Sequence, residues 1–327
     1  MSTSNKITIN EISHRIGDFI NNSTIKKTSI YSKKQDGYWD KLFAAIDTIE
    51  DTCLAIENFQ KDPNNCFILN PYLSTYGILQ ALFIQQDAVN FLNVSLFGEN
   101  KKIIWHKSYP DLDNIRKLRN ETIGHPIEAK QKGKQSKYAK DEISSCTIDR
   151  SSLSKNGFSY ILWMHSKTEK KSINFTKIIE LQNKNLSQEL ENILKGLQNE
   201  ERQHKLKFKN ENLSDLLSDK SLYQVNLIYG VSWNDHLAWP SFEHFFDQYK
   251  KIRNGIENRY GKFGNSLRLP GTAEVIKKLD YIFSKIEIFK NTQQFNEQEF
   301  EIYVDALDTS LKELKDHLQE IDNEFKL

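Results

Sequence analysis

The sequence has few cysteines, and their arrangement argues against two classes of protein. Its 327 residues include three cysteines, Cys53, Cys66 and Cys146, none of which forms a Cys-x-x-Cys pair. An odd number of scattered cysteines is unlike a disulfide framework or a zinc ribbon. We therefore expect a reducing compartment, and the predicted location is cytoplasmic.

Long hydrophobic runs are also missing. The opening MSTSNKITINEISHRIG has no apolar core and does not resemble a secretory signal. The most apolar stretch, residues 76–96, is interrupted by Gln85-Gln86-Asp87, which is unlike a membrane span. We expect a soluble protein with no membrane partner.

No excess of charge of either sign is present. The 45 basic and 44 acidic residues leave a net charge of +1, so contact with nucleic acid would depend on local basic patches. One such patch has no acidic residue between positions 129 and 140 but contains Lys130, Lys132, Lys134, Lys137 and Lys140. This segment either follows an RNA backbone or is an ordinary solvated loop.

Signatures of several other enzyme classes are absent. There is no Gly-x-Ser-x-Gly elbow, and Gly261-Lys262-Phe263-Gly264 lacks the pattern of a phosphate-binding loop. The eight-residue spacing of His236 and His244 fits no pair of metal ligands on a helix. We predict no metal and no cofactor.

Helical periodicity dominates what is present. Apolar residues recur at steps of three and four in the segments 39–59, 72–97, 111–123, 176–207, 239–260, 272–289 and 296–325. Asn156-Gly157 is a strong hairpin signal, and residues 172–175 are a candidate third strand. The predicted fold is mainly α, a helical bundle with a β-hairpin or meander inserted at about 145–175 and a C-terminal helical region.

The last predicted helix carries a narrow apolar seam on otherwise acidic faces. The seam consists of Leu307, Leu311, Leu314, Leu318, Ile321 and Phe325. Such a seam either packs within the chain or joins two subunits.

The strongest functional signal is the segment from Ile115 to Pro126. Its helical pattern places Arg119 and Asn120 beside an apolar side, and Gly124 suits a left-handed residue just past a helix end. Since Pro126 cannot continue a helix, we predict that His125 lies at an exit turn. Arg119 and His125 would then be about 9 Å apart along the axis, at 1.5 Å per residue.

This segment resembles the signature of HEPN-domain ribonucleases. Those proteins are helical bundles whose motif is an Arg, usually a polar residue, and a His after four to six intervening residues. Here the matching residues are Arg119, Asn120 and His125, and the preceding YGILQALFIQQDAVNFL is similar to the family's second helix. The resemblance covers residues 39–126 well, and residues 176–207 are a plausible closing helix.

The resemblance implies a domain organisation and a function. It implies a HEPN-like domain with the inserted hairpin at 36–210. Outside the resemblance, the polar residues 1–35 are expected to form an arm or a short helix around 12–20, and 211–327 a helical regulatory or dimerisation region. The resemblance also implies a homodimer in which two motifs meet and cleave RNA. The expected setting is toxin–antitoxin or antiviral (abortive infection) defence, with an antitoxin or regulatory protein as a further partner.

The chemistry of the motif agrees with this implied activity. RNA supplies its own nucleophile, the 2′-hydroxyl, so cleavage needs a base, an acid and a cation but no metal. We assign the catalytic roles to Arg119 for phosphate charge and His125 for proton transfer, with Asn120 in support. The candidate RNA-binding residues are Arg116, Lys117, Lys130, Lys132 and Lys134.

Two alternatives remain at this point. The chain could have a HEPN-like fold without catalysis and act as a binding or dimerisation module. It could also be an unrelated helical bundle, in which Gly124 simply caps a helix that bears a surface arginine.

Overall fold

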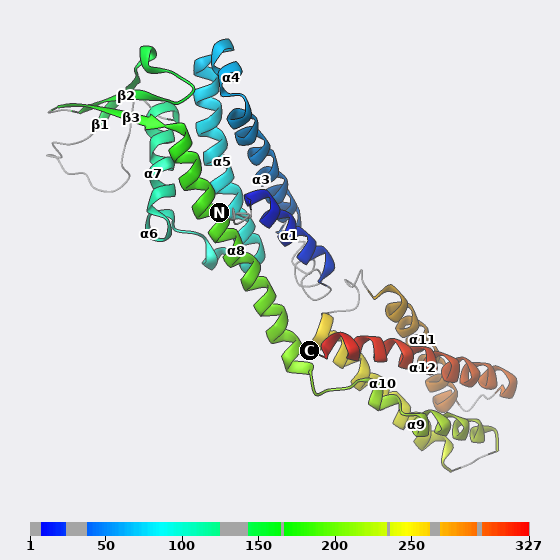
Figure 1. Cartoon of the computed structure of the whole chain (residues 1–327). Helices are drawn as coiled ribbons and strands as arrows, with labels where there is room; N and C mark the ends of the chain where they lie inside the picture. Colours follow the sequence, from blue (N-terminus) through cyan, green and yellow to red (C-terminus); the bar gives the residue numbers. More distant parts are fainter. Residues whose placement is uncertain are drawn as a thin grey trace, which may run out of the picture. The chain divides into compact units, whose positions relative to one another are not determined.

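The computed structural model describes residues 8–23, 38–124, 143–164, 167–233, 236–261, 269–292 and 296–326. These residues are mainly helical and include one small antiparallel sheet (Figure 1). This confirms the predicted mainly α class with an inserted β-meander. The chain divides into two compact units. Unit 1 consists of residues 1–19 and 33–196, and unit 2 consists of residues 20–32 and 197–327.

Unit 1 contains most of the helices that precede the sheet and the first part of the long helix that follows it. These helices are α1 (Ile9–Asn22), α3 (Tyr38–Lys61), α4 (Pro63–Leu69), α5 (Pro71–Phe97), α6 (Trp105–Ser108), α7 (Pro110–Arg119) and α8 (Phe175–Phe208). The long helices α3 and α5 pack side by side (Figure 1). The division between the units falls inside α8, not after it at residue 210.

Of the two alternatives for the polar N-terminal segment, an arm or a short helix, residues 9–22 adopt the helix. They form α1, in which Ile9, Ile12 and Ile16 are buried. These isoleucines recur at steps of three and four, so they share one face of the helix. The segment therefore contributes an apolar face to the packed core.

Local signals fix both ends of α5, the central helix of unit 1. The side chain of Asn70 accepts a hydrogen bond from the N–H of Leu73 at 3.0 Å, and Pro71 occupies the first helical position. At the other end Gly98 has a φ of 95°, and its N–H donates to the carbonyl of Val94. These caps set which residues α5 presents to its neighbours.

The sheet has the order β1-β2-β3, with antiparallel strands β1 (Ile143–Ile148), β2 (Gly157–Met164) and β3 (Thr168–Asn174). Phe158, Tyr160 and Leu162 alternate along β2 and are buried, so one face of the sheet lies on the core. Gly157 has a φ of 152°, and a Cβ there would lie 1.8 Å from the carbonyl oxygen of Ile173. Glycine is thus required because β3 passes close to this position.

Unit 2 is a second helical assembly with its own core. It contains the end of α8, α9 (Asp219–Tyr223), α10 (Ala238–Tyr260), α11 (Pro270–Thr292), α12 (Glu297–Phe325), and 3₁₀ helices at Ser214–Leu217 and Gln224–Trp233. All six residues of the α12 seam are buried in this core. The seam therefore packs within the chain. Within the described segments, no helix combines the length and apolar character that a membrane crossing requires.

Candidate functional site

Arg119 is the last residue of α7, a helix with one buried face. Pro110 occupies its first helical position, and Leu112, Ile115 and Leu118 are buried at steps of three. Arg119 follows directly after the last of them. Its side chain is therefore half-buried at the border of the core.

Helical winding continues beyond Arg119. Residues Asn120–Gly124 form one turn of π-helix, and the hydroxyl of Thr122 donates to the carbonyl of Leu118 at 2.7 Å. The prediction that Gly124 is left-handed is wrong, because its φ is not positive. The wider hydrogen-bonding pattern of a π-turn carries the winding through Gly124, so the helix does not end between Arg119 and this glycine.

The guanidinium of Arg119 is held by two amide side chains. Its Nε and Nη2 donate to Oε1 of Gln80 at 3.0 and 2.9 Å, and its Nη1 donates to Oδ1 of Asn120 at 3.0 Å. Its Cζ also lies 4.5 Å from the ring centroid of Phe83. Gln80 and Phe83 both belong to α5, so the packing of α7 on α5 orients the motif arginine.

Gly124 allows Arg119 to lie close to the π-turn. A Cβ at position 124 would be 2.8 Å from Nη1 of Arg119 and 3.4 Å from Oδ1 of Asn120. A side chain at this position would therefore displace the guanidinium from its amide partners. The glycine is needed for this close approach and not for a left-handed backbone.

The two other motif cations have carboxylate partners. Nη1 of Arg116 lies 2.8 Å from Oδ1 of Asp87 on α5, and its Cζ is 4.1 Å from the Phe83 ring centroid. Lys117 is exposed, and its Nζ lies 2.7 Å from Oδ2 of Asp113, one turn earlier. Their positive charges are therefore partly compensated, whereas no carboxylate in the described part of the chain pairs with Arg119.

Glu121 introduces a second titratable group into the π-turn. The turn packs against β1, and Glu121 is half-buried there. Burial raises the pKa of Glu121, although Lys171 and Lys117 partly offset this effect. Burial, with a smaller contribution from the charge of Glu121, also raises the pKa of Cys146 to about 11. The carboxyl group of Glu121 is thus easier to protonate than an exposed one.

His125 lies outside the described residues, as do Lys130, Lys132 and Lys134. Their roles in proton transfer and RNA binding stay predictions. Within the described residues, Asn120 accepts a hydrogen bond from Arg119, and the guanidinium groups of Arg116 and Arg119 both lie over the Phe83 ring.

The sequence reasoning missed the partners on α5. Gln80 and Asp87 are seven positions apart, with Phe83 between them, so all three lie toward one side of that helix. Polar residues at this spacing on a largely apolar helix are the signal that could have indicated them. Glu121 had no comparable signal, because its burial depends on contact with the sheet.

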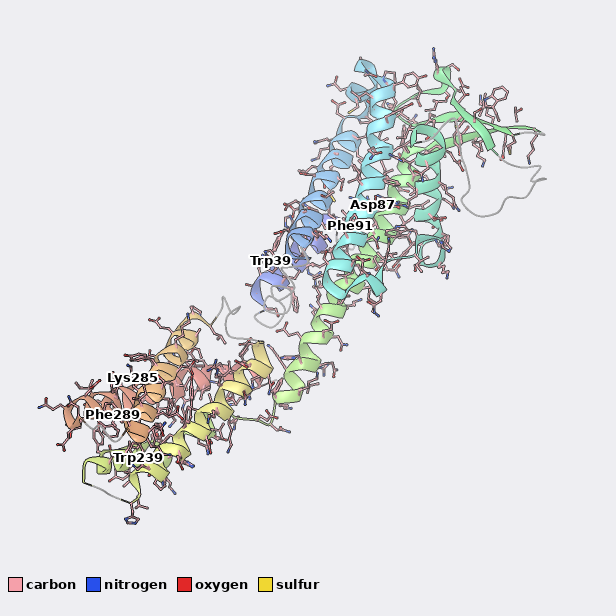
Figure 2. The ribbon with its side chains drawn as sticks, turned by 180° about the vertical axis from the view of Figure 1, so that it is seen from behind. Trp39, Asp87, Phe91, Trp239, Lys285 and Phe289 are labelled. Atoms are coloured by element: carbon pink, nitrogen blue, oxygen red, sulfur yellow. The ribbon has the colours of Figure 1, made fainter. Side chains whose placement is uncertain are left out.

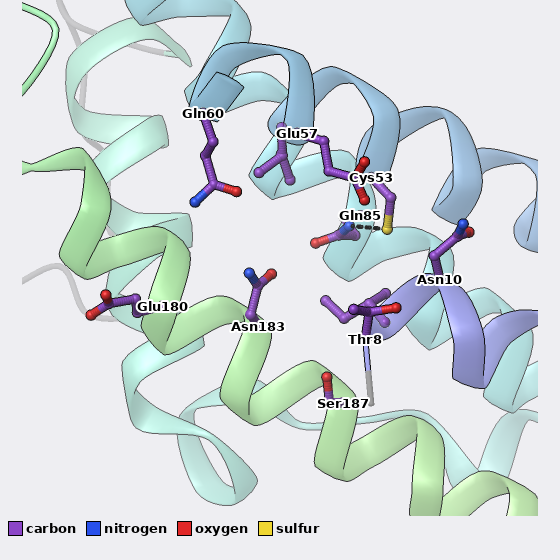
Figure 3. A pocket seen from close by; sticks show the side chains of 11 residues that line it. Thr8, Asn10, Cys53, Glu57, Gln60, Gln85, Glu180, Asn183 and Ser187 are labelled. Carbon is purple, nitrogen blue, oxygen red and sulfur yellow. Dashed lines mark hydrogen bonds between the residues drawn. The ribbon is translucent and has the colours of Figure 1, made fainter. Parts of the chain in front are cut away.

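Unit 1 also contains a cavity of about 320 Å³ between α1, α3, α5 and α8 (Figure 3). Its lining includes Asn10, Cys53, Glu57, Gln85, Glu180 and Asn183. Nε2 of Gln85 donates to Sγ of Cys53 at 3.3 Å, and burial raises the pKa of Cys53 to about 11. This thiol is thus held in its protonated, poorly nucleophilic form. Gln85 and Gln80 are about 140° apart around α5, so the cavity and the Arg119 site use different sides of that helix.

Among the described residues, no group of histidine, cysteine, aspartate and glutamate side chains is arranged to hold a metal ion. Comparisons with protein-family models, curated proteins and solved structures found no match to this chain.

Proposed function

We propose that this protein is a metal-independent endoribonuclease of the HEPN type. The observation that carries the proposal is the state of Arg119. Its partners Gln80 and Asn120 are neutral, and it forms no ion pair with any described residue. A fixed guanidinium without a carboxylate partner keeps its charge for an anion such as phosphate.

The proposed reaction uses the 2′-hydroxyl of RNA as nucleophile. His125 removes its proton, the oxygen attacks the adjacent phosphorus, and the bond from phosphorus to the 5′-oxygen breaks. The leaving 5′-oxygen takes up a proton from water, which gives a 2′,3′-cyclic phosphate and a 5′-hydroxyl. Arg119 stabilises the charge that develops on the phosphorane, and Asn120 keeps Arg119 in position.

A stripe of exposed residues on α5 supports the homodimer. Leu73, Tyr76, Ile84 and Phe91 are exposed, with 69% of Leu73 and 56% of Phe91 accessible. Gln80 and Asp87 lie on the same side of the helix, in steps of three and four with these residues. Asp87 and Phe91 are labelled on α5 in Figure 2. A second copy that covers this α5 stripe would lie beside both Arg119 sites and could complete each with its own motif.

The test is cleavage of total RNA and transfer RNA in EDTA by purified protein. Removal of the charge-stabilising donor in Arg119→Ala should lower the rate by about 100-fold or more. His125→Ala should lower it by a similar factor, since it removes the proton-transfer group. The matched control is Arg202→Ala, which removes an exposed arginine of α8 and should leave the rate unchanged. Cleavage that survives both motif substitutions would disprove the site, and loss of cleavage in EDTA would disprove the metal-free mechanism.

A non-catalytic HEPN-like binding or dimerisation module is the second candidate function. The α5 stripe favours it independently of catalysis, because exposed apolar residues on one helix face suit contact with another chain. Sedimentation of wild type against Phe91→Asp separates the candidates. A dimer that is lost in Phe91→Asp, together with no RNA cleavage by the wild type, would support the binding module.

The defence role and its control are part of the proposal. Unit 2 would regulate or dimerise the nuclease, and an antitoxin or regulatory protein would hold it inactive in the cytoplasm. Growth arrest on expression of the wild type, but not of Arg119→Ala, is the expected result. Equal growth of the two strains would count against a toxin.

A further inference from the structure

The sheet of unit 1 has one face on the core and one face open. Along β2 the residues that alternate with the buried Phe158, Tyr160 and Leu162 point away from the core. Strand pairing places residues of β1 and β3 beside them. We call this surface the outer face of the sheet, formed by Thr147, Ser159, Ile161, Trp163, Lys170 and Ser172.

Trp163 is the largest side chain of the outer face. It is 44% exposed, although its Nε1 donates to the Thr147 hydroxyl on β1 at 3.1 Å. This hydrogen bond fixes the orientation of the indole while leaving much of its surface accessible. A ring that is already oriented loses little conformational entropy when a second planar group stacks on it.

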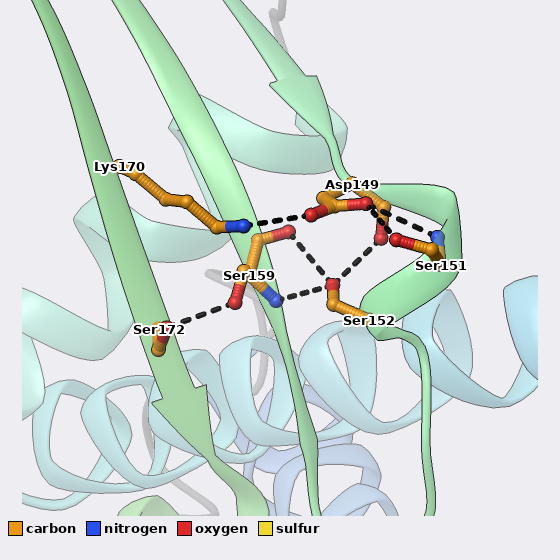
Figure 4. A network of polar contacts seen from close by, with 6 residues as sticks. All are labelled: Asp149, Ser151, Ser152, Ser159, Lys170 and Ser172. Atoms are coloured by element: carbon orange, nitrogen blue, oxygen red, sulfur yellow. Dashed lines mark hydrogen bonds and ion pairs between the residues drawn. The ribbon is translucent and has the colours of Figure 1, made fainter.

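Apart from Ile161, the rest of the outer face is polar, and its side chains on β2 and β3 are held in place by hydrogen bonds (Figure 4). Nζ of Lys170 lies 2.9 Å from Oδ2 of Asp149, and the hydroxyls of Ser159 and Ser172 are 2.8 Å apart. Hydrogen bonds from the Ser151 hydroxyl and from Lys170 lower the pKa of Asp149 to about 2. The network stays intact at neutral pH and positions Lys170 beside a row of hydroxyl groups.

The sheet is basic in a chain that is close to neutral. From residue 143 to 174 the described residues include five cations, Arg150, Lys155, Lys167, Lys170 and Lys171, and two acidic residues, Asp149 and Glu169. The chain as a whole has 45 basic and 44 acidic residues. This local excess of positive charge is complementary to a phosphate backbone.

We propose that the outer face of the sheet binds single-stranded RNA. A base stacks on Trp163, and the exposed Arg150, Lys155 and Lys167, which pair with no carboxylate among the described residues, contact the phosphates. The inference rests on the proposed ribonuclease function and identifies its substrate as unpaired RNA. The π-turn that follows Arg119 packs against β1, an edge strand of this sheet, so bound RNA lies next to the motif.

Binding is tested separately from cleavage with a fluorescein-labelled ten-nucleotide oligouridine that carries 2′-O-methyl groups. This probe cannot be cut by 2′-hydroxyl attack. Fluorescence anisotropy with the full chain should give a dissociation constant that rises about tenfold or more in Trp163→Ala, from the loss of base stacking. Trp163→Phe should retain most of the affinity. Lys167→Ala should reduce the salt dependence of binding by about one phosphate contact.

Controls exclude unfolding and nonspecific loss of an aromatic group. Tyr223→Ala removes another exposed aromatic residue, in unit 2, and should bind the probe as the wild type does. Circular dichroism should give the same melting curve for Trp163→Ala and the wild type. Unchanged affinity in Trp163→Ala, no affinity of the wild type for the probe, or equal affinity for a duplex would each overturn the inference.

Cleavage assays separate failure of this inference from failure of the proposed function. With a cleavable RNA, Trp163→Ala should raise KM about tenfold and leave kcat unchanged, because stacking acts on binding. Probe binding that depends on Trp163, without any RNA cleavage, supports this surface and counts against the nuclease. Cleavage with a KM that is unchanged in Trp163→Ala supports the nuclease and counts against RNA binding by the outer face.

Discussion

The dipeptide Arg-Asn occurs once in each unit, and its two arginines have opposite electrostatic surroundings. In unit 1, Arg119 is bound by the neutral amides of Gln80 and Asn120. In unit 2, Nη1 of Arg253 lies 2.8 and 2.9 Å from the two carboxylate oxygens of Asp280. The charge of Arg253 is neutralised by its partner, while Arg119 has no carboxylate partner among the described residues.

The difference shows that the partner on the neighbouring helix decides what such an arginine does. A carboxylate turns the guanidinium into a structural tie, while an amide orients it and leaves it available to an anion. Unit 2 also contains a buried example of the arginine–carboxylate pair, formed by Arg259 and Asp322, whose side chains are 0% and 3% exposed.

The largest effect is expected at Asp322. Its carboxylate accepts hydrogen bonds from Arg259 and from the N–H groups of Leu213 and Ser214. Asp322→Asn should lower the free energy of unfolding of unit 2 by about 3–5 kcal/mol, because it leaves a buried guanidinium without a counter-charge. Denaturant titration with hydrogen exchange of α10 and α12 measures this loss. The exposed Asp316→Asn on the same helix is the control and should change little.

The next largest effect is expected when Arg119 is given a carboxylate partner like that of Arg253. Gln80→Glu keeps the shape of the side chain but places a carboxylate on the guanidinium. We expect RNA cleavage in EDTA to fall by about 100-fold, because the charge no longer acts on phosphate. Thermal stability should stay the same or rise slightly. Full activity in Gln80→Glu would show that the neutral partner is irrelevant.

A smaller effect is expected from Gly124→Ala. The added methyl group would overlap Nη1 of Arg119, so the guanidinium must shift away from Asn120. Cleavage should fall by about tenfold, the cost of a small misplacement, with little change in melting temperature. Gly77→Ala on α5 is the matched control, since a Cβ there meets no atom within 4 Å.

The reverse exchange in unit 2, in which an amide replaces the carboxylate partner of Arg253, should have a still smaller effect. Asp280→Asn removes one counter-charge of Arg253, but Glu257 stays 3.6 Å from its Nε, and the Arg253–Asp280 pair is about 40% exposed on each side. We expect a loss of about 0.5–1 kcal/mol in the free energy of unfolding and no change in RNA cleavage. A cleavage defect in this variant would contradict the assignment of activity to unit 1.

The smallest effect concerns pH, and its sign should differ between the units. Burial raises the pKa of Glu121, so its contribution to stability is full below its unfolded pKa and is lost as pH rises through the folded pKa. At Asp322 burial alone would raise the pKa of the carboxyl group. Hydrogen bonds from Arg259 and the backbone outweigh burial and lower this pKa. That stability is present above the unfolded pKa and is lost as pH falls through the folded one.

Glu121→Gln is the variant that separates these two effects. It should slightly stabilise unit 1 at pH 7 and make no difference at pH 4, where the native carboxyl is largely protonated. Melting curves of wild type and Glu121→Gln at the two pH values measure this difference. An equal shift at both values would exclude titration of Glu121 as the cause.

The fold was largely accessible from the sequence wherever a local signal sets it. Apolar spacing located α5, α8, α10 and α12 to within a few residues, and Asn156-Gly157 indicated the pairing of β1 with β2. The division inside α8 was not accessible, because the same amphipathic pattern continues through both units.

The site was accessible only in part. The Arg-Asn pair is contiguous in sequence, so Arg119 and Asn120 could be predicted together. Gln80 is 39 residues away from Arg119, and only the packing of α7 on α5 brings the two together. The conformation of Gly124 was missed because a π-turn depends on which carbonyls the backbone N–H groups reach, and no residue type specifies that choice.

The π-turn at Asn120–Gly124 has a consequence for how the motif tolerates changes in length. A π-turn takes up one more residue per hydrogen-bonded loop than an α-turn does. A single-residue deletion between Arg119 and Gly124 could therefore be absorbed by a return to α-helical winding, without unravelling α7. The number of residues between the motif arginine and the motif histidine is thus adjustable by one at this turn. Chains with different numbers of residues between them can therefore present the same arginine and histidine side chains.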